Sequence, residues 1–380
     1  MDKLRIGVIG VCGRGGIANQ WHNNKRSEVV GGADVTDAAL ADFKGRMGDD
    51  VFLTKDYREL LDRKDVDAIA VTAPDFMHEE LAVAALQAGK HVFCEKPLAI
   101  TTAGCDHILS TWKNSNQKLM VGFNMRYMNI FRVMKEIIDS GAIGEVKAAW
   151  CRHFVGEGRT FYYQDWHATK KGSNSLLLQK GSHDLDMIHW LTGQYTKKVA
   201  AFGSLDMFGG DKPNDLRCPA CDEQDTCWEV ADKDCPRNQC CFRQEVEVED
   251  NNTMIMELDG GIKASYLQCH FTPDYHRNYT IIGTEGRLEN SEPENRVWVK
   301  MRRANSWKEL ADRTYDIRPA MGGHGGADPV ITEDFLDMVL EGKEPLATPI
   351  AGRMSVAAGC AGADSMRSGG VMQEVPEIAW

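Results

Sequence analysis

Glycines crowd the turn after the first apolar run of the chain, where backbone can approach a phosphate closely. Leu4–Gly10 is typical of a strand, and Ile17–Asn24 is typical of the helix that follows it. We expect the residues of the turn between them to contact a dinucleotide: Gly10, Cys12, Gly13, Arg14, Gly15 and Gly16. Such a turn aims a helix N-terminus at a pyrophosphate. The spacing departs from a strict Gly-x-Gly-x-x-Gly, because Cys12 stands at the position of the second glycine.

An acid follows this turn at the spacing that a dinucleotide site needs, roughly 20 residues further on. It is Asp34, near the end of a second predicted strand, Glu28–Val35. A carboxylate there accepts hydrogen bonds from the adenosine ribose hydroxyls and repels a 2′-phosphate. Because no arginine follows at Val35 or Thr36, the sequence favours NAD over NADP. A turn acid is the alternative interpretation of Asp34.

Two patterns of elements must position these residues. Apolar strand-like runs alternate with helical runs up to Gly122, which predicts a parallel, doubly wound α/β sheet. Beyond Gly122 the strand-like runs alternate apolar and polar residues, which is typical of antiparallel strands. We therefore predict a Rossmann domain over residues 1–122 and an α+β domain with a large, mostly antiparallel open sheet over residues 123–380. A polar, cysteine-rich insertion is predicted at residues 209–244.

A lysine motif follows the fourth predicted strand, at the carboxyl edge where such sheets bind ligands. It reads Cys-Glu-Lys-Pro-Leu-Ala from Cys94 to Ala99, and the chain here resembles the Gfo/Idh/MocA oxidoreductases, whose hallmark is Glu-Lys-Pro. The resemblance covers essentially the whole chain. Its other motifs are, in order, Thr72–Pro74, Gly122–Tyr127, Gly181–Asp186 and Gly323–Asp328.

The resemblance implies that Lys96 lies between nicotinamide and substrate. In a dry cleft the pKa of a lysine falls, and as a cation the side chain polarises a hydroxyl or carbonyl. Other residues in or shortly after the matching motifs are then expected to contact the cofactor: Thr72, Ala73, Pro74, His78, Glu95, Asn124 and Arg126.

The resemblance places the general base at His183, at the start of a helix. Asp186 lies three residues later on the same face and is expected to orient His183 or bind a substrate hydroxyl. The chain departs from many sugar dehydrogenases of the family, which carry an aspartate four residues before the histidine. Here that residue is Gln179, which cannot accept a proton, so Lys180, His183, Asp184 and Asp186 must share the work.

Aromatic and polar residues elsewhere are candidates for the substrate pocket, because aromatic rings stack on sugar rings. With Lys96, the expected substrate contacts are Tyr163, Trp166, His167, Gln179, Asp184 and His324. Ordinary packing is the alternative for the aromatic residues. A mobile glycine-rich loop is the alternative for His324.

Six of the twelve cysteines fall within Cys218–Cys241. Cys218 and Cys221 form a Cys-x-x-Cys pair, which with Cys227 and Cys235 predicts a structural zinc site of four thiolates. An iron–sulfur cluster, disulfides and free thiols remain alternatives.

The net charge of −12 makes nucleic acid or an anionic membrane an improbable partner. Residues 211–250, a stretch that overlaps the insertion and runs a few residues beyond it, hold twelve acids and five bases and so account for −7 of that charge. A long cysteine-bearing chain without a signal peptide predicts a cytoplasmic protein.

The leading hypothesis is an NAD-dependent oxidoreductase acting on a secondary alcohol of a sugar, cyclitol or glycoside. One alternative is an NAD-dependent glycoside hydrolase or lyase that oxidises C3 transiently, with no net redox change. A second is a dinucleotide-binding sensor without catalytic activity. By resemblance, a homodimer or homotetramer is expected.

Overall fold

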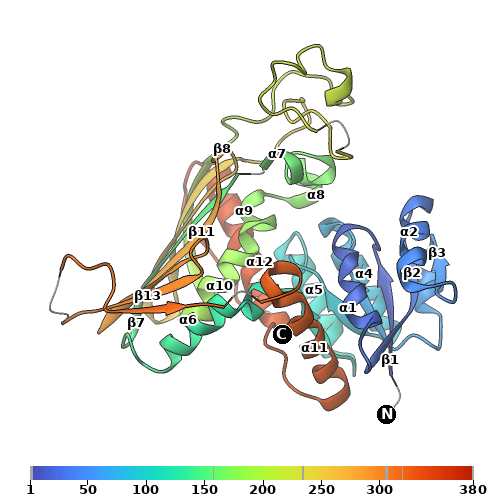
Figure 1. Ribbon diagram of the computed structural model, residues 1–380, viewed down its shortest axis with the longest axis horizontal. Coiled ribbons are helices and arrows are strands. Elements are labelled where there is room, and N and C mark those ends of the chain that lie inside the picture. The colour runs from blue at the N-terminus through green and yellow to red at the C-terminus, as the bar shows by residue number, and fades with distance from the viewer. Residues whose placement is uncertain (1–2, 157, 233–234, 304–306, 319, 379–380) are drawn as a thin grey trace. The chain divides into compact units, whose positions relative to one another are not determined.

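The chain of 380 residues was analysed as a computed structural model, which describes residues 3–156, 158–232, 235–303, 307–318 and 320–378. It divides into two compact units. The first comprises residues 1–132, 318–356 and 377–380, and the second comprises residues 133–317 and 357–376. The ribbon in Figure 1 distinguishes the twisted sheet of the first unit from the long strands of the second.

A six-stranded parallel sheet forms the centre of the first unit. Its strand order is β3-β2-β1-β4-β5-β6, with the order reversing between β1 and β4. The strands are β1 (Leu4–Ile9), β2 (Ser27–Ala33), β3 (Phe52–Thr54), β4 (Ala68–Val71), β5 (His91–Cys94) and β6 (Leu119–Val121). The helices between them are α1 (Ala18–His22), α2 (Asp37–Met47), α3 (Tyr57–Leu61), α4 (His78–Gln87) and α5 (Thr102–Lys113). This arrangement confirms the doubly wound sheet.

A helix from near the C-terminus, α11 (Gly323–Glu341), belongs to the first unit. Its Phe335 ring lies 5.7 Å from both Trp21 and Phe93, and all three side chains are fully buried. The units therefore differ from a simple division after residue 122. The sequence analysis did not foresee that α11 packs on the first unit, because nothing in its mix of polar and apolar residues points to Trp21 or Phe93.

A nine-stranded, mostly antiparallel sheet forms the second unit, in the order β14-β13-β12-β11-β7-β10-β9-β8-β15. Among the described strands, β7 and β10 form its one parallel pair. The strands are β7 (Val146–Val155), β8 (Thr196–Ser204), β9 (Asn251–Leu258), β10 (Lys263–Cys269), β11 (Tyr275–Gly283), β12 (Gly286–Ser291), β13 (Arg296–Met301), β14 (Arg313–Asp316) and β15 (Gln373–Glu374). Burial alternates along β9, so one face packs on helices and the other is exposed.

The remaining helices are α6 (Asn129–Asp139), α7 (Gly158–Phe161), α8 (Lys170–Ser173), α9 (Leu176–Gln179), α10 (Gly181–Thr192) and α12 (Pro349–Arg367). Small residues on α12 allow close packing: a Cβ at Gly359 or Gly362 would meet Leu178 or Leu177 of α9. Within the second unit this holds α9, and the start of α10 directly after it, in a fixed position.

Candidate functional site

The glycine turn follows β1 and opens into the short 3₁₀ helix η1 (Gly13–Ile17). Gly10 has φ +86°, and a Cβ on it would lie 2.5 Å from the backbone nitrogen of Ala73, so no larger residue fits. A Cβ on Gly13 or Gly16 would meet nothing within 4 Å, because these residues border open space. The glycines thus serve two purposes, tight packing at Gly10 and free access at the turn.

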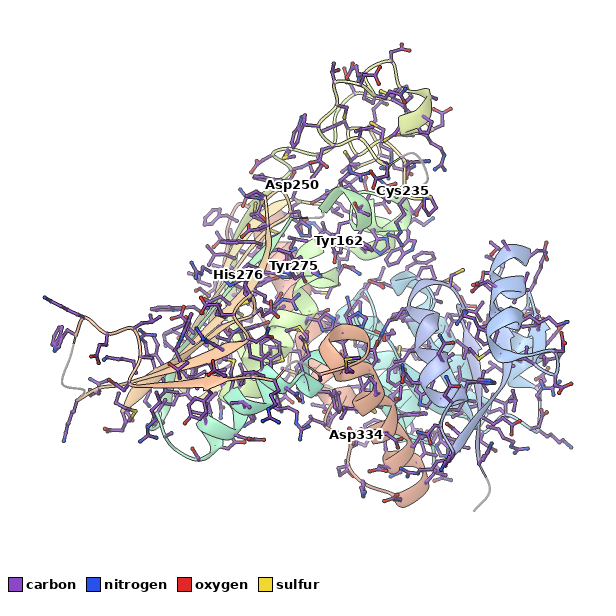
Figure 2. The ribbon with its side chains drawn as sticks, in the orientation of Figure 1. Tyr162, Cys235, Asp250, Tyr275, His276 and Asp334 are labelled. Atoms are coloured by element: carbon purple, nitrogen blue, oxygen red, sulfur yellow. The ribbon has the colours of Figure 1, made fainter. Side chains whose placement is uncertain are left out.

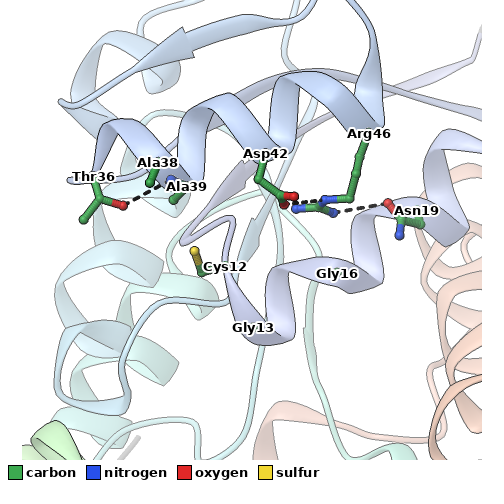
Figure 3. Close-up of a pocket in the computed structure, with 9 residues that line it drawn as sticks. All are labelled: Cys12, Gly13, Gly16, Asn19, Thr36, Ala38, Ala39, Asp42 and Arg46. Carbon is green, nitrogen blue, oxygen red and sulfur yellow. Dashed lines mark hydrogen bonds and ion pairs between the residues drawn. The ribbon is translucent and has the colours of Figure 1, made fainter. Parts of the chain in front are cut away.

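Cys12 causes no strain at the position where the motif has glycine. Its φ is −82°, a value that any residue adopts. A cavity of about 460 Å³ opens beside it, and Figure 3 shows the residues that line this cavity: Cys12, Gly13, Gly16, Asn19, Thr36, Ala38, Ala39, Asp42 and Arg46. The departure from strict spacing therefore does not close the turn to a ligand.

Asp34 lies at the edge of this turn, just beyond β2. Its Oδ2 accepts a hydrogen bond from the backbone nitrogen of Val11 at 3.2 Å, and its Oδ1 accepts one from that of Thr36 at 3.1 Å. Arg46 donates to Asp42 at 2.9 Å and to the Val11 carbonyl at 2.9 Å. Since Arg46 is already paired with a carboxylate and Asp34 is nearby, the charges suit a ribose with a free 2′-hydroxyl.

The motifs after β4 and β5 lie beside this turn, because both strands are neighbours in the sheet and β4 pairs with β1. Thr72 donates from Oγ1 to the Gly10 carbonyl at 2.7 Å. Glu95 is buried and Lys96 is half-buried, and the Lys96 backbone nitrogen donates to Glu95 Oε2 at 3.1 Å. These segments share the carboxyl edge of one sheet, as the strand order requires.

His78 is fully buried between the two motifs. Its Nδ1 lies 2.7 Å from the Pro97 carbonyl oxygen, and its Nε2 lies 2.9 Å from the Ala73 carbonyl oxygen. Two acceptors are satisfied together only by a protonated ring. Burial alone would lower the pKa of His78, but Cys94, Asp75 and the Pro97 carbonyl raise it to about 10. The imidazolium thus connects the loop after β4 to the loop after β5. Because it is buried, it would affect a bound cofactor only by holding these two loops in position.

Arg14 ties the glycine turn to two other segments of the first unit. Its Nε lies 2.5 Å from Glu95 Oε1, and its Nη1 and Nη2 donate to the two oxygens of Asp328 at 2.9 and 2.8 Å. His324 is exposed, and its Nδ1 lies 2.9 Å from Asp328 Oδ2 and 3.2 Å from Arg14 Nη1. Burial alone would raise the pKa of Asp328, but His324 and Arg14 hold it well below its usual value. The structure therefore brings Arg14, Glu95, His324 and Asp328 into one cluster.

The segment after β6 is more deeply buried than a ligand-contacting segment needs to be. Asn124 and Arg126 are both buried, and Arg126 Nη1 donates to the Leu346 carbonyl at 2.6 Å. This bond gives Arg126 a structural role within the first unit.

In the second unit, Lys180 directly precedes α10, which carries His183 and Asp186 on its first turns. Both are buried, as is Gln179 at the end of α9. The half-buried Lys180 ammonium lies 5.2 Å from the centre of the Tyr162 ring and 5.4 Å from that of Tyr275. Burial lowers the pKa of Lys180, so its amine exchanges a proton more readily than an exposed lysine does.

Asp184 was expected to contact a substrate, and this prediction was wrong. It lies in the first turn of α10, and its side chain is fully buried between that helix and the sheet. His153 Nδ1 lies 2.8 Å from its Oδ2, Tyr266 donates to the same oxygen at 2.7 Å, and Arg277 Nε lies 3.0 Å from its Oδ1. Tyr279 also donates to Oδ1. Burial alone would raise the pKa of Asp184, but Arg277 and His153 hold it far below its usual value. The carboxylate anchors α10 to the sheet.

The partners of Asp184 escaped the sequence analysis because they lie on three separate strands. Tyr266 on β10 and Tyr279 on β11 both pair in register with Cys151 of β7, and Arg277 pairs with His153. Polar residues at every second position of strands that are otherwise apolar on that face were the available signal. Burial and Arg277 lower the pKa of His153 to about 3, so its ring is neutral at physiological pH.

The aromatic candidates separate into buried and accessible side chains. Tyr163 is fully buried, stacks on Phe208 at 4.1 Å, and donates from its hydroxyl to the Glu249 carbonyl at 3.3 Å. It belongs to the core, which corrects its prediction as a substrate contact. Trp166 and His167 are half-buried and stack on each other at 3.6 Å. Figure 2 shows Tyr162 close to Tyr275.

The predicted zinc ligands do not assemble as expected. Among the described residues, no group of three or more His, Cys, Asp or Glu side chains is arranged to hold a metal ion. Five cysteines line a narrow cavity of about 20 Å³: Cys218, Cys221, Cys227, Cys240 and Cys241. Cys235 lies outside it, with its thiol 3.5 Å from the Arg237 carbonyl oxygen. The set Cys218, Cys221, Cys227 and Cys235 therefore does not fit a tetrahedral site.

No helix in the described ranges has the length and apolar character needed to cross a membrane.

Known proteins show similarity over both units. The model of an oxidoreductase family with an NAD-binding Rossmann fold matches residues 4–123, and its C-terminal α/β domain matches residues 135–373. YteT of Bacillus subtilis (strain 168) is 28% identical over 77% of this chain and 78% of its own length.

Inositol 2-dehydrogenase of Salmonella typhimurium is 31% identical, but the match covers only 52% of this chain and 57% of that protein. Levoglucosan dehydrogenase in complex with NADH and levoglucosan has the same fold, with a TM-score of 0.82 at 21% identity, covering 99% of this chain and 100% of that one. The family model, the glycine turn and the Glu-Lys-Pro motif after β5 agree, and the chain belongs to the Gfo/Idh/MocA family of NAD-binding oxidoreductases.

Proposed function

We propose that this oxidoreductase is an NAD-dependent dehydrogenase that oxidises a secondary alcohol of a sugar or cyclitol. The observation that carries the proposal is the turn of the first unit, where access at Gly13 and Gly16 combines with Asp34 at the edge. Inositol 2-dehydrogenases among the relatives and levoglucosan dehydrogenase among the structural neighbours support a polyol substrate.

The residues present fit a dinucleotide. The backbone of η1 would hold its phosphates, and Asp34 would accept hydrogen bonds from its ribose. Once bound, NAD supplies the acceptor for a hydride from the carbinol carbon.

We assign the proton transfer to the second unit. His183 takes the proton of the substrate hydroxyl as the general base. Many relatives carry an aspartate at the position of Gln179. In this chain Lys180, whose pKa is lowered by burial, takes over the role of that aspartate and accepts the proton from His183. Lys96 polarises the substrate oxygen from the Glu-Lys-Pro loop, and Asp186 orients His183. Asp184 holds the start of α10 in place and acts only through its neighbours.

The experiment is a kinetic comparison of two variants with two matched controls. His183→Asn and Lys96→Met are each expected to lower kcat about 10²- to 10⁴-fold, with the affinity for NADH retained. The controls are His276→Asn on β11 and the exposed Lys64→Met, which are expected to leave kcat within about twofold. Equal kcat values for His183→Asn and His276→Asn would remove His183 from the mechanism.

We also propose that two copies of the chain pair through the exposed face of the nine-stranded sheet. Trp150, Ser265, Ile255 and Ala200 lie in register across β7, β10, β9 and β8. Trp150 on β7 is 49% and Ile255 on β9 is 62% exposed, and with only β10 between their strands these large apolar residues make an exposed apolar patch. Lys263 and Glu257, both on this face, provide charges of both signs for a self-complementary contact.

The absence of any disulfide among the described cysteines supports our proposal of a reducing compartment, such as the cytoplasm. Redox-neutral glycoside cleavage would use the same residues, but no contact among the described residues of either unit favours it over net oxidation.

A further inference from the structure

The cysteine-rich insertion, residues 209–244, contacts a segment of the second unit that carries aromatic residues, 158–168. Figure 1 shows the insertion as a yellow-green loop next to α7 and α8. Two reciprocal hydrogen bonds join the side-chain amide of Gln164 to the backbone of Gln239. Gln164 Nε2 donates to the Gln239 carbonyl at 2.7 Å, and the Gln239 backbone nitrogen donates to Gln164 Oε1 at 2.9 Å. The Asp165 backbone nitrogen donates to Gln239 Oε1 at 3.0 Å. Three hydrogen bonds thus hold two adjacent residues of the segment.

Two arginines of the insertion hold the preceding residues. Arg243 is fully buried, and its Nη1 donates to the Tyr163 carbonyl at 2.6 Å and to the Cys240 carbonyl at 3.0 Å. The guanidinium of Arg237 lies 5.2 Å from the centre of the Phe161 ring and donates to the Phe161 carbonyl at 3.4 Å. The insertion therefore bonds to Phe161, Tyr163, Gln164 and Asp165 of the segment.

The base of the insertion is itself fixed. The Asp250 carboxylate, labelled in Figure 2, accepts hydrogen bonds at 2.8 Å from the backbone nitrogens of Asp206, Met207 and Phe208. Phe208 then stacks on Tyr163. Because its base is rigid, the insertion can transmit a defined position to residues 158–168.

On the other side of the segment, Tyr162 lies next to Lys180, one of the proposed catalytic residues. Tyr162 stands between Phe161 and Tyr163, which the insertion holds. The centre of its ring lies 5.2 Å from Lys180 Nζ and 5.0 Å from the centre of the His270 ring. Lys180 in turn donates to the Tyr275 hydroxyl at 3.3 Å. Figure 2 shows Tyr162 and Tyr275 near each other.

The segment cannot hold this position by itself. Helix α7 has four residues and the 3₁₀ helix after it, Asp165–Ala168, also has four. Helices of this length are far below the size at which they are stable alone. Asp165 also has φ +47°, a conformation that a non-glycine residue keeps only where its surroundings impose it.

We propose that the insertion is a specificity-determining element: it clamps residues 158–168 so that Tyr162 forms one wall of the substrate pocket beside Lys180. The role in substrate binding rests on the proposed dehydrogenase function. Gln164 and Gln239 are positioning residues that act through Tyr162.

The test compares Gln164→Leu and the milder Gln239→Ala with Arg217→Ala. Among the described contacts, the Arg217 side chain bonds only to Asn238, which also lies in the insertion. Arg217→Ala is therefore the matched control, because it removes a contact of the insertion that does not reach residues 158–168. Hydrogen exchange is measured for the amides of residues 158–168, together with KM for the sugar, kcat and the affinity for NADH.

Both glutamine variants are expected to exchange faster over residues 158–168 than the wild type and Arg217→Ala. KM is expected to rise about fivefold or more for Gln239→Ala, which loses one hydrogen bond to the segment, and further for Gln164→Leu, which loses two to Gln239. In both variants kcat is expected to stay within about twofold and NADH affinity to be unchanged. Exchange equal to that of the wild type in both variants overturns the clamp, and faster exchange with an unchanged KM overturns its role in specificity. A wild type that oxidises no sugar or cyclitol would refute the proposed function, while the exchange comparison would still decide whether the clamp exists.

Discussion

At the scale of single residues, the cofactor end of the molecule depends on one carboxylate. Asp34 is held by the backbone nitrogens of Val11 and Thr36, so its charge stays at the mouth of the turn. Cys12 next to it shows that the second glycine of the motif can be replaced where φ stays negative.

Replacing Asp34 with serine and Val35 with arginine is expected to shift the preference from NAD toward NADP. The change removes the repulsion of a 2′-phosphate and adds a cation to pair with it. The ratio of kcat/KM for the two cofactors is expected to change by about 10²-fold or more. The single variant Val35→Ser, which keeps Asp34, is the control. If the double variant keeps the wild-type ratio, Asp34 does not read the ribose.

His78 is expected to make stability depend on pH. Its pKa is raised to about 10 in the folded chain, against about 6.5 in an unfolded chain, so its stabilising effect is complete below about pH 6.5 and is lost as the pH rises through about 10. The free energy of unfolding of His78→Gln is therefore expected to fall below that of the wild type by on the order of 3 kcal/mol at about pH 6, and by much less at about pH 10.5. Urea denaturation at both pH values measures this. A deficit of equal size at both would mean that the ring is neutral when folded.

At the scale of elements, α11 is attached to the Rossmann sheet by two arginines of different burial. Arg14 pairs with Asp328 at its start and is 22% exposed. Arg26 pairs with Glu333, Asp337 and Glu341 along the same helix and is 34% exposed, with partners 25% to 49% exposed. Buried pairs are far more sensitive than exposed ones to the loss of one partner.

Arg14→Ala is expected to destabilise the first unit by about 3 kcal/mol, because Glu95 and Asp328 stay buried without their cation. Arg26→Ala serves as the control and is expected to cost less than about 1 kcal/mol. Thermal and urea unfolding provide the measurement. Equal losses for the two variants would contradict the distinction by burial.

Much of this element order could be predicted from the sequence, and the reasons for the failures are physical. The bounds of β1 and β2 agree to within two residues with the predicted strands Leu4–Gly10 and Glu28–Val35, because those runs are mostly apolar. β3 and β14 have three and four residues, too short to show a period. The sequence analysis wrongly placed Asp184 in the substrate pocket. Its burial could not be foreseen, because the residues that surround it lie on β7, β10 and β11 and are remote from it in sequence.

At the scale of the whole molecule, two features of the second unit bear on what the chain binds. One is the insertion, which overlaps the acidic stretch 211–250 and five of whose cysteines line a narrow cavity instead of forming the predicted zinc site. The other is the exposed apolar face of the nine-stranded sheet, which we propose as the contact between two copies.

Ile255→Lys is expected to convert the proposed assembly to single chains, since it places a charge at the centre of that face. The molar mass measured by light scattering is expected to fall about twofold or more. Trp228→Lys, an equally drastic change at an exposed apolar residue of the insertion, is the control and is expected to leave the mass unchanged. A wild type that is already a single chain would contradict this account.

The most direct test of the central claim follows NADH and sugar together. The wild type is incubated with NAD and a panel of sugars, cyclitols and nitrophenyl glycosides, and NADH, oxidised product and released nitrophenol are all quantified. The account predicts that at least one sugar or cyclitol gives NADH and oxidised product in equal amounts, and that His183→Asn slows the formation of both about 10²- to 10⁴-fold. Release of nitrophenol without accumulation of NADH would contradict it, and would show that the chain cleaves glycosides with no net oxidation.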